Sequence, residues 1–269
     1  MPDIIETAYH QRGYDPLYNL RHSHDECFEI IQIYSGSGSV LIGERLYPMQ
    51  PDSVYFINGL ETHATNPRES EKYVRNKVIV SGSFLNELCR VCGIEEIQKR
   101  LFLERGGACH RPDAALSQQM DGLFARIHSA AGQHDFAKGH VASLLLELLL
   151  MVQRFTEADE QPVSQIDTLM RHINENLYGQ LDIDSLAQAV HLSKYYMCRL
   201  FKRQTNMTIM EYIIQRRISE AKKLLLYSRL SISEIALRTG FSSLSFFSRA
   251  FREREGITPS QFRGGQPAR

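Results

Sequence analysis

The sequence predicts an α+β protein of two domains, in which a strand-rich N-terminal half precedes an all-helical C-terminal half. In the first half, FEIIQIY (28–34), SVLIG (39–43) and SVYFI (53–57) are β-branched or aromatic runs separated by Gly, Ser and Pro, as is typical of short strands. After residue 164, hydrophobic residues recur with the spacing of helices. At 269 residues the chain is long enough for two ordinary domains, each with its own core.

The N-terminal half is expected to change from strands to helices near residue 80. Helical spacing follows near 83–91, 113–130 and 136–156. The last of these helices has a wide apolar face that contains Leu144, Leu145, Leu148, Met151, Val152 and Phe155.

A polar, acidic segment with a proline, EADEQPVS (157–164), is the predicted linker between the two halves. The predicted domains are therefore 1–156 and 165–269.

An internal repeat organises the C-terminal half. IDSLAQAVHLS (183–193) aligns with ISEIALRTGFS (232–242) at an offset of 49 residues. YMCRLFKRQTNMT (196–208) aligns with FFSRAFREREGIT (246–258) at an offset of 50, so one residue is inserted in the second turn. Each copy predicts a short helix, a tight turn and a longer helix.

The ends of these helices carry caps. Capping boxes, in which a hydroxyl and a carboxylate each satisfy a free backbone N–H, are expected to begin helices after Thr208 and Ser231. Left-handed residues are expected to end helices at Asn206, Gly240 and Gly256.

Charge divides along the same boundary. Residues 1–164 contain 15 Lys and Arg against 22 Asp and Glu, a net charge of −7, whereas residues 165–269 contain 16 against 9, a net charge of +7. A basic domain attached to an acidic one suggests a polyanionic partner. Between the repeats, the twenty residues from Thr208 to Tyr227 contain no Pro or Gly and predict a rod of about 30 Å, close to one turn of duplex DNA at roughly 34 Å.

Once the hydrophobic residues are assigned to the core, the longer helix of each repeat keeps a polar, basic face. Such a helix can enter the major groove of double-stranded DNA, where Arg bonds guanine edges. The expected DNA-contacting residues are Lys194, Tyr195, Cys198, Arg199 and Lys202 in the first copy and Leu244, Ser245, Ser248, Arg249 and Arg252 in the second.

Residues 166–263 resemble the DNA-binding domain of the AraC/XylS (arabinose-regulator) family. The motifs that carry the resemblance are LAQAVHLSKYYMCRLFK, EYIIQRRISEAKKLLL and ISEIALRTGFSSLSFFSRAFREREGITPSQFR. The resemblance implies a tandem helix-turn-helix transcription regulator. It also implies that the second helix of each repeat reads bases, which favours Tyr195, Arg199, Ser245 and Arg249.

The N-terminal half contains His22-x-His24-x4-Glu29, followed by Pro51-Asp52 and His63. This pattern resembles that of the cupins, in which two histidines and a glutamate join a later histidine inside a β-barrel. The resemblance implies a cupin-like barrel over about 1–80. The second half of the pattern is degenerate, because Asn58 and Leu60 stand where Pro and Gly are usual.

Three interpretations of His22, His24, Glu29 and His63 remain open. They can line a pocket for a small metabolite, as in sugar-responsive members of the family. They can instead hold a transition metal, since imidazole and carboxylate are suitable ligands, in a cupin enzyme or a metal sensor. They can also be structural barrel residues. We expect the metabolite pocket, with no metal, no cofactor and no enzyme activity, because the second motif is degenerate and a DNA-binding half is attached.

The family resemblance also implies an antiparallel helix pair for dimerisation. We therefore expect a homodimer through the helix 136–156, whose apolar face would serve both the domain core and the subunit contact. The expected regulator activates a sugar catabolic operon by recruiting RNA polymerase when its effector binds.

The sequence shows no targeting segment. The N-terminus lacks a basic start followed by an apolar core, and the run Val141–Val152 is shorter than the roughly 20 residues of a membrane span. Five scattered cysteines favour a reducing compartment. We therefore expect a soluble cytoplasmic protein, in which Cys89-x-x-Cys92 is a packing feature rather than a redox motif.

Overall fold

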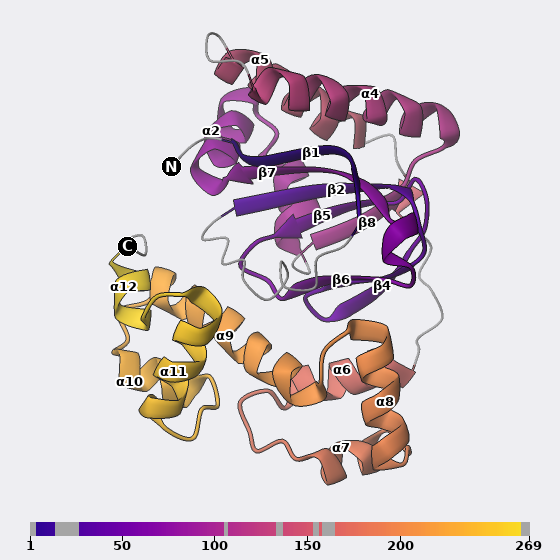
Figure 1. Cartoon of the computed structure of the whole chain (residues 1–269). Helices are drawn as coiled ribbons and strands as arrows, with labels where there is room; N and C mark the ends of the chain where they lie inside the picture. The colour runs from indigo at the N-terminus through magenta and orange to yellow at the C-terminus, as the bar shows by residue number, and fades with distance from the viewer. Residues whose placement is uncertain are drawn as a thin grey trace.

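A computed structural model describes residues 4–13, 27–104, 107–132, 137–152, 156–157 and 165–264. Figure 1 shows helices above the sheets of the N-terminal half and the helices of the C-terminal half below them. The predicted division into a β-rich and an all-helical half is confirmed. All but the first residue of the predicted linker 157–164 lies outside the described residues, so the domain limits stay a prediction.

Two antiparallel sheets form the described part of the β-rich half. The larger sheet has the order β1 (Ile4–Arg12), β7 (Val74–Ser81), β2 (Cys27–Ser35), β5 (Val54–Asn58), β8 (Gly107–Arg111) and β9 (Thr156–Glu157). The smaller sheet has the order β4 (Arg45–Met49), β3 (Gly38–Ile42) and β6 (His63–Pro67). The three predicted strands correspond to β2, β3 and β5.

The side chains of β2 point alternately to the two faces of the larger sheet, because successive side chains of a strand lie on opposite faces. The two faces pack in two different cores. Phe28 and Ile30 pack in the core shared with the helices. Ile31 and Ile33 pack in the core between the sheets, together with Val40 of β3. Glu29 is two residues before Ile31 and lies on the same face of β2, so it also points between the sheets.

Helices cover the outer face of the larger sheet (Figure 1). They are α2 (Gly82–Cys92), α3 (Glu95–Gln98), α4 (Ala114–Ala131) and α5 (Ala137–Met151), with short turns of helix at η1 (Ser70–Lys72) and η2 (Lys99–Leu103). The hydroxyl of Ser81 caps α2 and the carboxylate of Asp113 caps α4. The predicted helices near 83–91, 113–130 and 136–156 correspond to α2, α4 and α5. The prediction is wrong at the end of the last helix, because α5 ends at Met151 and Thr156 belongs to strand β9 of the larger sheet, while Phe155 lies outside the described residues.

The apolar face of α5 requires a correction. Leu144 is 1% exposed and Leu148 is 0% exposed, and both pack within the chain's own core. The prediction that this face also forms a subunit contact is wrong for these two residues, because they are buried in the chain's own core, where α2, α3 and α4 pack against α5. The outward side of α5 instead carries Ser143, Glu147 and Leu150.

Cys89 is part of the same core. Its thiol is buried, and burial together with the nearby Cys92 and Glu95 raises the pKa of Cys89 to about 11. The thiol therefore stays protonated at neutral pH, which supports packing rather than redox chemistry.

Seven helices make up the described part of the C-terminal half. They are α6 (Gln165–Glu175), α7 (Ile183–Ala189), α8 (Lys194–Thr205), α9 (Ile209–Tyr227), α10 (Ile232–Arg238), α11 (Leu244–Glu255) and α12 (Pro259–Arg263). The predicted repeat is confirmed as α7-turn-α8 and α10-turn-α11. Capping boxes begin α9 at Thr208 and α10 at Ser231. Asn206, Gly240 and Gly256 adopt left-handed conformations, with φ of 59°, 82° and 74°.

The helix α9 connects two small cores. Tyr212, near its N-terminus, packs with Met197 and Phe201 of the first unit. Leu225, near its C-terminus, packs with Phe247 of the second unit. One uninterrupted helix therefore belongs to both helix-turn-helix units.

The smaller sheet packs on the first of these units. Leu41 of β3 and Ala64 of β6 belong to the hydrophobic cluster of α6, α7 and α8. Asn66 Nδ2 donates to the Arg203 carbonyl oxygen at 2.9 Å, and the Ser39 hydroxyl donates to the carbonyl of Gln204. The two halves of the chain are thus in direct contact beside the C-terminal end of α8.

Candidate functional site

The first candidate surface is the outward face of α8. Lys194, Tyr195, Arg199 and Lys202 are exposed there, and Cys198 is half-buried. Tyr195 is 87% exposed, which is more than a packing role in the first unit would leave accessible. The structure therefore brings these five predicted residues to one accessible face.

The equivalent face of α11 contains the second predicted set. Leu244, Ser245, Arg249 and Arg252 are exposed, and Ser248 is half-buried. The Arg249 guanidinium carbon lies 5.8 Å from the centre of the Phe246 ring, which is within the range of a cation–π contact. The ring therefore helps to orient a guanidinium whose donors remain free to face an external partner.

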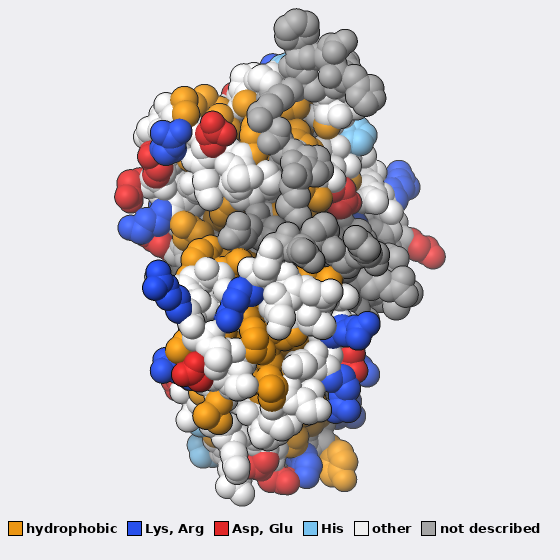
Figure 2. Space-filling model, turned by 90° about the vertical axis from the view of Figure 1, so that its left-hand side faces the viewer, with side chains coloured by type: hydrophobic (Ala, Val, Ile, Leu, Met, Phe, Trp, Pro, Cys, Tyr) orange, Lys and Arg blue, Asp and Glu red, His pale blue; other side chains and the backbone are white. Residues whose placement is uncertain are grey.

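Positive charge accompanies both faces. Figure 2, which looks onto the side of the second unit, shows Lys and Arg side chains around a strip of hydrophobic side chains in its lower part, where C-terminal helices lie. On α8, Lys194 is partly neutralised, because its Nζ lies 2.9 Å from Asp184 Oδ1 of α7. The charged groups best placed for a polyanion are therefore the arginines and Lys202.

Arg217 of α9 fixes the two units relative to each other. Its guanidinium donates to the carbonyl oxygens of Leu177 at 2.9 Å, Gly240 at 2.6 Å and Gly179 at 2.7 Å. Gly240 lies in the turn of the second unit, whereas Leu177 and Gly179 precede the first. One side chain thus joins the turn of the second unit to the segment that leads into the first, and this contact helps to set the spacing between α8 and α11.

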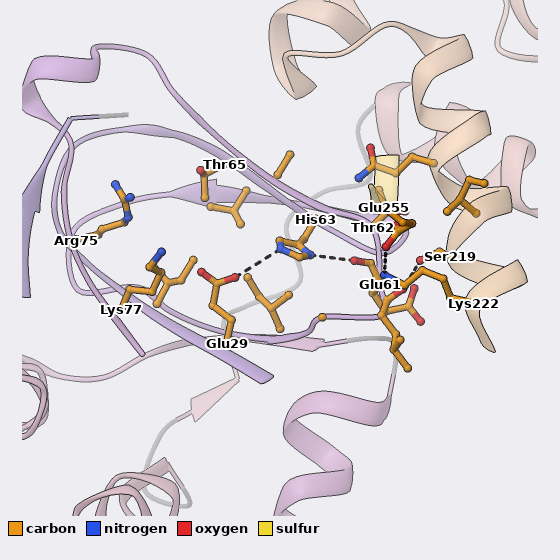
Figure 3. A pocket seen from close by; sticks show the side chains of 18 of the residues that line it. Glu29, Glu61, Thr62, His63, Thr65, Arg75, Lys77, Ser219, Lys222 and Glu255 are labelled. Carbon is orange, nitrogen blue, oxygen red and sulfur yellow. Dashed lines mark hydrogen bonds and ion pairs between the residues drawn. The ribbon is translucent and has the colours of Figure 1, made fainter. Parts of the chain in front are cut away.

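The second candidate site is a cavity between the two sheets (Figure 3). Glu29 of β2 and His63 of β6 lie inside it, with His63 Nε2 3.5 Å from Glu29 Oε2. His63 Nδ1 lies 2.9 Å from the carbonyl oxygen of Glu61, so this ring nitrogen donates. Because 3.5 Å is longer than a normal hydrogen bond, Glu29 and Nε2 keep capacity for a ligand hydroxyl.

The structure thus brings together two of the four residues predicted to line the pocket. His22 and His24 lie outside the described residues, and the four-residue cluster stays a prediction. Within the described ranges, no group of three or more His, Cys, Asp or Glu side chains could hold a metal ion.

Strand β7 supplies a basic wall that the sequence reasoning missed. Lys77 is 1% exposed and its Nζ lies 2.6 Å from Glu6 Oε1. The Arg75 guanidinium carbon lies 5.1 Å from the centre of the Tyr73 ring. Arg75 and Lys77 alternate with Val74, Asn76 and Val78, and this period of two could have revealed a strand with one polar face.

Two buried hydroxyl groups in the cavity lack a hydrogen-bond partner of standard geometry among the described residues. They belong to Thr62, which is 2% exposed, and Tyr73, which is 0% exposed. Burial raises the pKa of Tyr73 to about 12, so its hydroxyl stays protonated and able to donate. A buried unsatisfied polar group costs about 1–3 kcal/mol, so a ligand hydroxyl that bonds the hydroxyl of Thr62 would be favoured.

Helix α9 closes one side of the cavity. Gln215, Ser219 and Lys222 line it from α9, and Glu255 lines it from the end of α11. Lys222 Nζ lies 3.0 Å from Glu255 Oε2, and both side chains are at most 9% exposed. The wall of the cavity is therefore shared between the β-rich half and the helix that carries both helix-turn-helix units.

Comparisons with known proteins agree with this architecture. Residues 4–150 match the family described as "AraC-like ligand binding domain", and residues 186–265 match the "Helix-turn-helix domain" family. The chain is therefore a transcription regulator with a ligand-binding domain and a DNA-binding domain, as the sequence predicts. It belongs to the AraC family.

Among curated proteins, the "HTH-type transcriptional activator RhaR" of Escherichia coli O139:H28 is 26% identical over 249 residues, covering 90% of this chain and 86% of the relative. The protein of the same name from Salmonella agona is 25% identical over 250 residues, with the same coverage. These relatives are transcription regulators rather than enzymes, as expected for this chain.

Among solved structures, the DNA-binding domain of AdpA in complex with a target DNA is 29% identical, covers 36% of this chain and 87% of its own, and has a TM-score of 0.35. Apo ToxT from Vibrio cholerae is 13% identical, covers 91% of each chain and has a TM-score of 0.40. Within the described ranges, no helix of this chain has the length and apolar character of a membrane span.

Proposed function

We propose that this chain is a transcription activator of genes for the breakdown of a sugar or sugar derivative. The observation that carries the proposal is the shared cavity, in which Glu29 and His63 face the same space as Ser219 and Lys222 of α9. A molecule bound there contacts the helix that holds both reading helices. An effector that binds two arrangements of these parts with different affinity shifts their populations, which is sufficient for a switch.

The chemistry of the cavity supports a polyhydroxylated effector. Carboxylate and imidazole groups offer acceptors and donors to neighbouring hydroxyls, and the buried hydroxyls of Thr62 and Tyr73 add two more polar groups. A site built for such hydrogen bonds rejects analogues that lack them. Arg75 would also favour an acidic sugar derivative, whereas the charge of Lys77 is already paired with Glu6.

The proposed DNA contact uses both reading helices. Tyr195 and Arg199 of α8 and Ser245 and Arg249 of α11 would contact base edges in adjacent major grooves, while Lys202 and Arg252 would contact phosphates. Binding near a promoter would let the bound regulator recruit RNA polymerase in the cytoplasm.

We further propose that the chain forms a homodimer through the outward faces of α4 and α5. Leu150 of α5 is 42% exposed, and Leu146 beside it is half-buried. The Arg126 guanidinium of α4 lies 3.5 Å from Glu147 of α5. An accessible leucine beside charged groups is consistent with the apolar core and polar rim of a subunit interface.

A thermal-shift screen tests the effector class. The full chain is heated with a panel of aldoses, alditols and aldonates, and the proposal expects at least one of them to raise the melting temperature. Glu29→Gln should then weaken the binding of that compound by at least about tenfold, because a charge-assisted hydrogen bond is lost.

Glu69→Gln is the matched control, because Glu69 is exposed and pairs with Lys72 away from the cavity. It should bind the compound as the unsubstituted chain does. Binding by Glu29→Gln at full strength would exclude Glu29 from the site. A stoichiometric, tightly bound transition metal that is lost on replacing His63 would indicate a metal site instead.

A further inference from the structure

The cavity is narrow when the two halves of the chain are packed together. Its volume is about 70 Å³, counted as the space that the centre of a water molecule can occupy. Since one water needs about 10–15 Å³ of such space, the cavity has room for several ordered waters, which together are about the size of a hexose. A bound hexose would therefore fill the cavity and press on its walls. One of these walls is α9.

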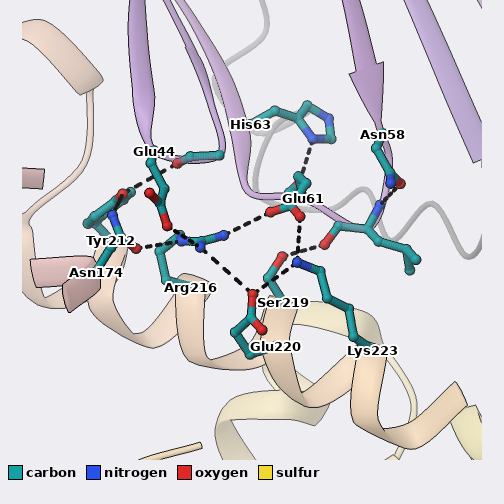
Figure 4. A network of polar contacts seen from close by, with 12 residues as sticks. Glu44, Asn58, Glu61, His63, Asn174, Tyr212, Arg216, Ser219, Glu220 and Lys223 are labelled. Carbon is teal, nitrogen blue, oxygen red and sulfur yellow. Dashed lines mark hydrogen bonds and ion pairs between the residues drawn. The ribbon is translucent and has the colours of Figure 1, made fainter. Parts of the chain in front are cut away.

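Glu61 holds α9 against the smaller sheet (Figure 4). Its Oε2 lies 2.8 Å from Arg216 Nη1, and its Oε1 lies 2.5 Å from Lys223 Nζ. Glu61 is 10% exposed and the Arg216 side chain 6% exposed, so these charges have little access to water. We call Glu61, Arg216 and Lys223 the Glu61 latch.

Further groups surround the latch. Glu44 Oε1 lies 3.1 Å and Glu220 Oε1 lies 3.8 Å from Arg216 Nη2, and the Arg216 Nε donates to Asn174 Oδ1 at 2.9 Å. Glu220 Oε1 also lies 2.9 Å from Lys223 Nζ. Arg216 and Lys223 therefore keep a carboxylate partner on α9 itself when Glu61 is withdrawn, so the latch can open without leaving either cation unpaired.

The latch is directly connected to the residues that face the cavity. The carbonyl of Glu61 accepts from His63 Nδ1, and His63 Nε2 faces Glu29. The carbonyl of Leu60 accepts from the hydroxyl of Ser219 on α9. The segment 60–63 thus carries ligand-facing groups and α9-binding groups within four residues, and a shift of His63 on ligand binding moves the backbone of Glu61.

Resting on the proposed effector site, we propose that a hexose-sized effector, which fills the cavity, displaces α9 from the smaller sheet, and that this movement releases the Glu61 latch. The hydrogen bond from the Ser219 hydroxyl to the Leu60 carbonyl then breaks. Ser219 and Lys222 of α9 become accessible to the ligand and form one wall of the effector site. The basic half of the chain is freed from Glu44 and Glu61 of the acidic half. Its affinity for the DNA polyanion therefore rises.

Protonation of Glu61 does not release the latch near neutral pH. Burial by itself raises the pKa of Glu61, but the charges and hydrogen bonds of Lys223 and Arg216 lower it by more, so the net pKa lies below the ordinary value. The carboxylate is therefore ionised well below neutral pH, and its charge is lost only as the pH falls through that lowered pKa. Release at neutral pH needs a bound molecule.

The test uses a fluorescent reporter in α9. The chain contains no Trp, so Gln215→Trp places a single tryptophan on the half-buried rim of the cavity. In this background, Glu61→Gln and Lys223→Gln each remove one side of the latch, and Glu69→Gln is the control. Both latch variants should shift the emission to longer wavelength and increase quenching by acrylamide, whereas the control should match the parent.

DNA binding gives the second readout. Without the reporter, full-length Glu61→Gln should bind a specific duplex at least about tenfold more tightly than the unsubstituted chain, since breaking a buried ion pair strongly disfavours the packed arrangement. Far-ultraviolet circular dichroism establishes that each variant is folded. Folded latch variants with unchanged quenching and unchanged DNA affinity would overturn the proposal.

The sugar panel separates this inference from the proposed function. A sugar that raises the melting temperature but leaves the emission of the Gln215→Trp reporter unchanged would support the effector class. It would overturn the proposal that the effector displaces α9. If the latch variants shift the emission and increase quenching but no sugar raises the melting temperature, the role of the Glu61 latch is supported. The proposal of a sugar effector is then contradicted.

Discussion

Arg199 and Arg249 occupy equivalent positions of α8 and α11, and both guanidinium groups are exposed. A guanidinium can bond the O6 and N7 atoms of guanine together, which discriminates against other bases by about 1–3 kcal/mol. We therefore predict that Arg199→Ala and Arg249→Ala each weaken binding to the specific duplex by about 1–3 kcal/mol. Fluorescence anisotropy with specific and random duplexes measures the difference.

Arg90→Ala provides the control for this pair, because Arg90 is exposed on α2, far along the chain from both reading helices. It should leave the affinity for both duplexes unchanged. If Arg199→Ala weakened binding equally on specific and random DNA, Arg199 would contact phosphate rather than a base.

At the scale of an element, the turn between α10 and α11 depends on Gly240. Its φ is 82°, and an added Cβ would lie 3.0 Å from the Leu177 carbonyl oxygen and from the Arg217 guanidinium. Gly240→Ala should destabilise the chain by about 1–2 kcal/mol, because a left-handed conformation is costly for Ala and the contact is tight. Urea unfolding monitored by circular dichroism measures this.

Gly122→Ala is the matched control. Gly122 lies inside α4 with open space around the position of a Cβ. The same substitution should stabilise the chain there by about 0.5–1 kcal/mol, because Ala has the higher helix propensity. A Gly240→Ala variant as stable as the parent would show that the Arg217 contact is not rigid.

The helix α5 provides a second prediction at this scale. Leu150→Arg should convert the proposed dimer into a folded monomer, because it places a charge in the middle of the outward face. Leu148→Arg should instead fail to fold, since Leu148 is 0% exposed within the chain. Sedimentation velocity distinguishes the two, and an unchanged dimer for Leu150→Arg would place the interface elsewhere.

Local rules explain which elements could be predicted. The helix expected over 208–227 is observed as Ile209–Tyr227, because its capping box and its lack of Pro and Gly are encoded within the segment. Strand β7 does not show as an apolar run, because buried Lys77 interrupts it. Its period of two is the only local signal, and the partner of Lys77, Glu6, is distant in sequence. Periodicity shows that Leu148 lies on an apolar face of its helix but not what covers that face, so the predicted subunit contact is wrong at Leu148.

Some features of the candidate sites could be predicted from local sequence patterns, and others could not. Exposure of Arg199 and Arg249 follows from the repeat, and the proximity of Glu29 and His63 follows from a motif. The contact of Glu61 with Arg216 joins residues 155 apart in the chain and could not be predicted from local pattern.

For the whole molecule, the separation of charge gives a prediction. Residues 165–269 carry +7 and contain the complete repeat, so this segment alone should bind duplex DNA, with affinity that falls steeply as salt rises. The full chain should bind more weakly at low salt, because the N-terminal half adds −7. Titrations at several salt concentrations measure how the DNA affinity of the segment and of the full chain falls as salt rises. A salt-independent affinity would contradict an electrostatic contact with phosphates.

The single helix α9 has a consequence for the promoters that such a regulator serves. Because α9 and Arg217 fix α8 and α11 at one separation, the protein measures the distance between two short base sequences as well as their identity. A single base pair inserted between them would rotate one sequence away from its helix, and no local adjustment of the protein would restore both contacts. Operators should therefore tolerate substitutions one at a time but lose recognition abruptly on a change of length.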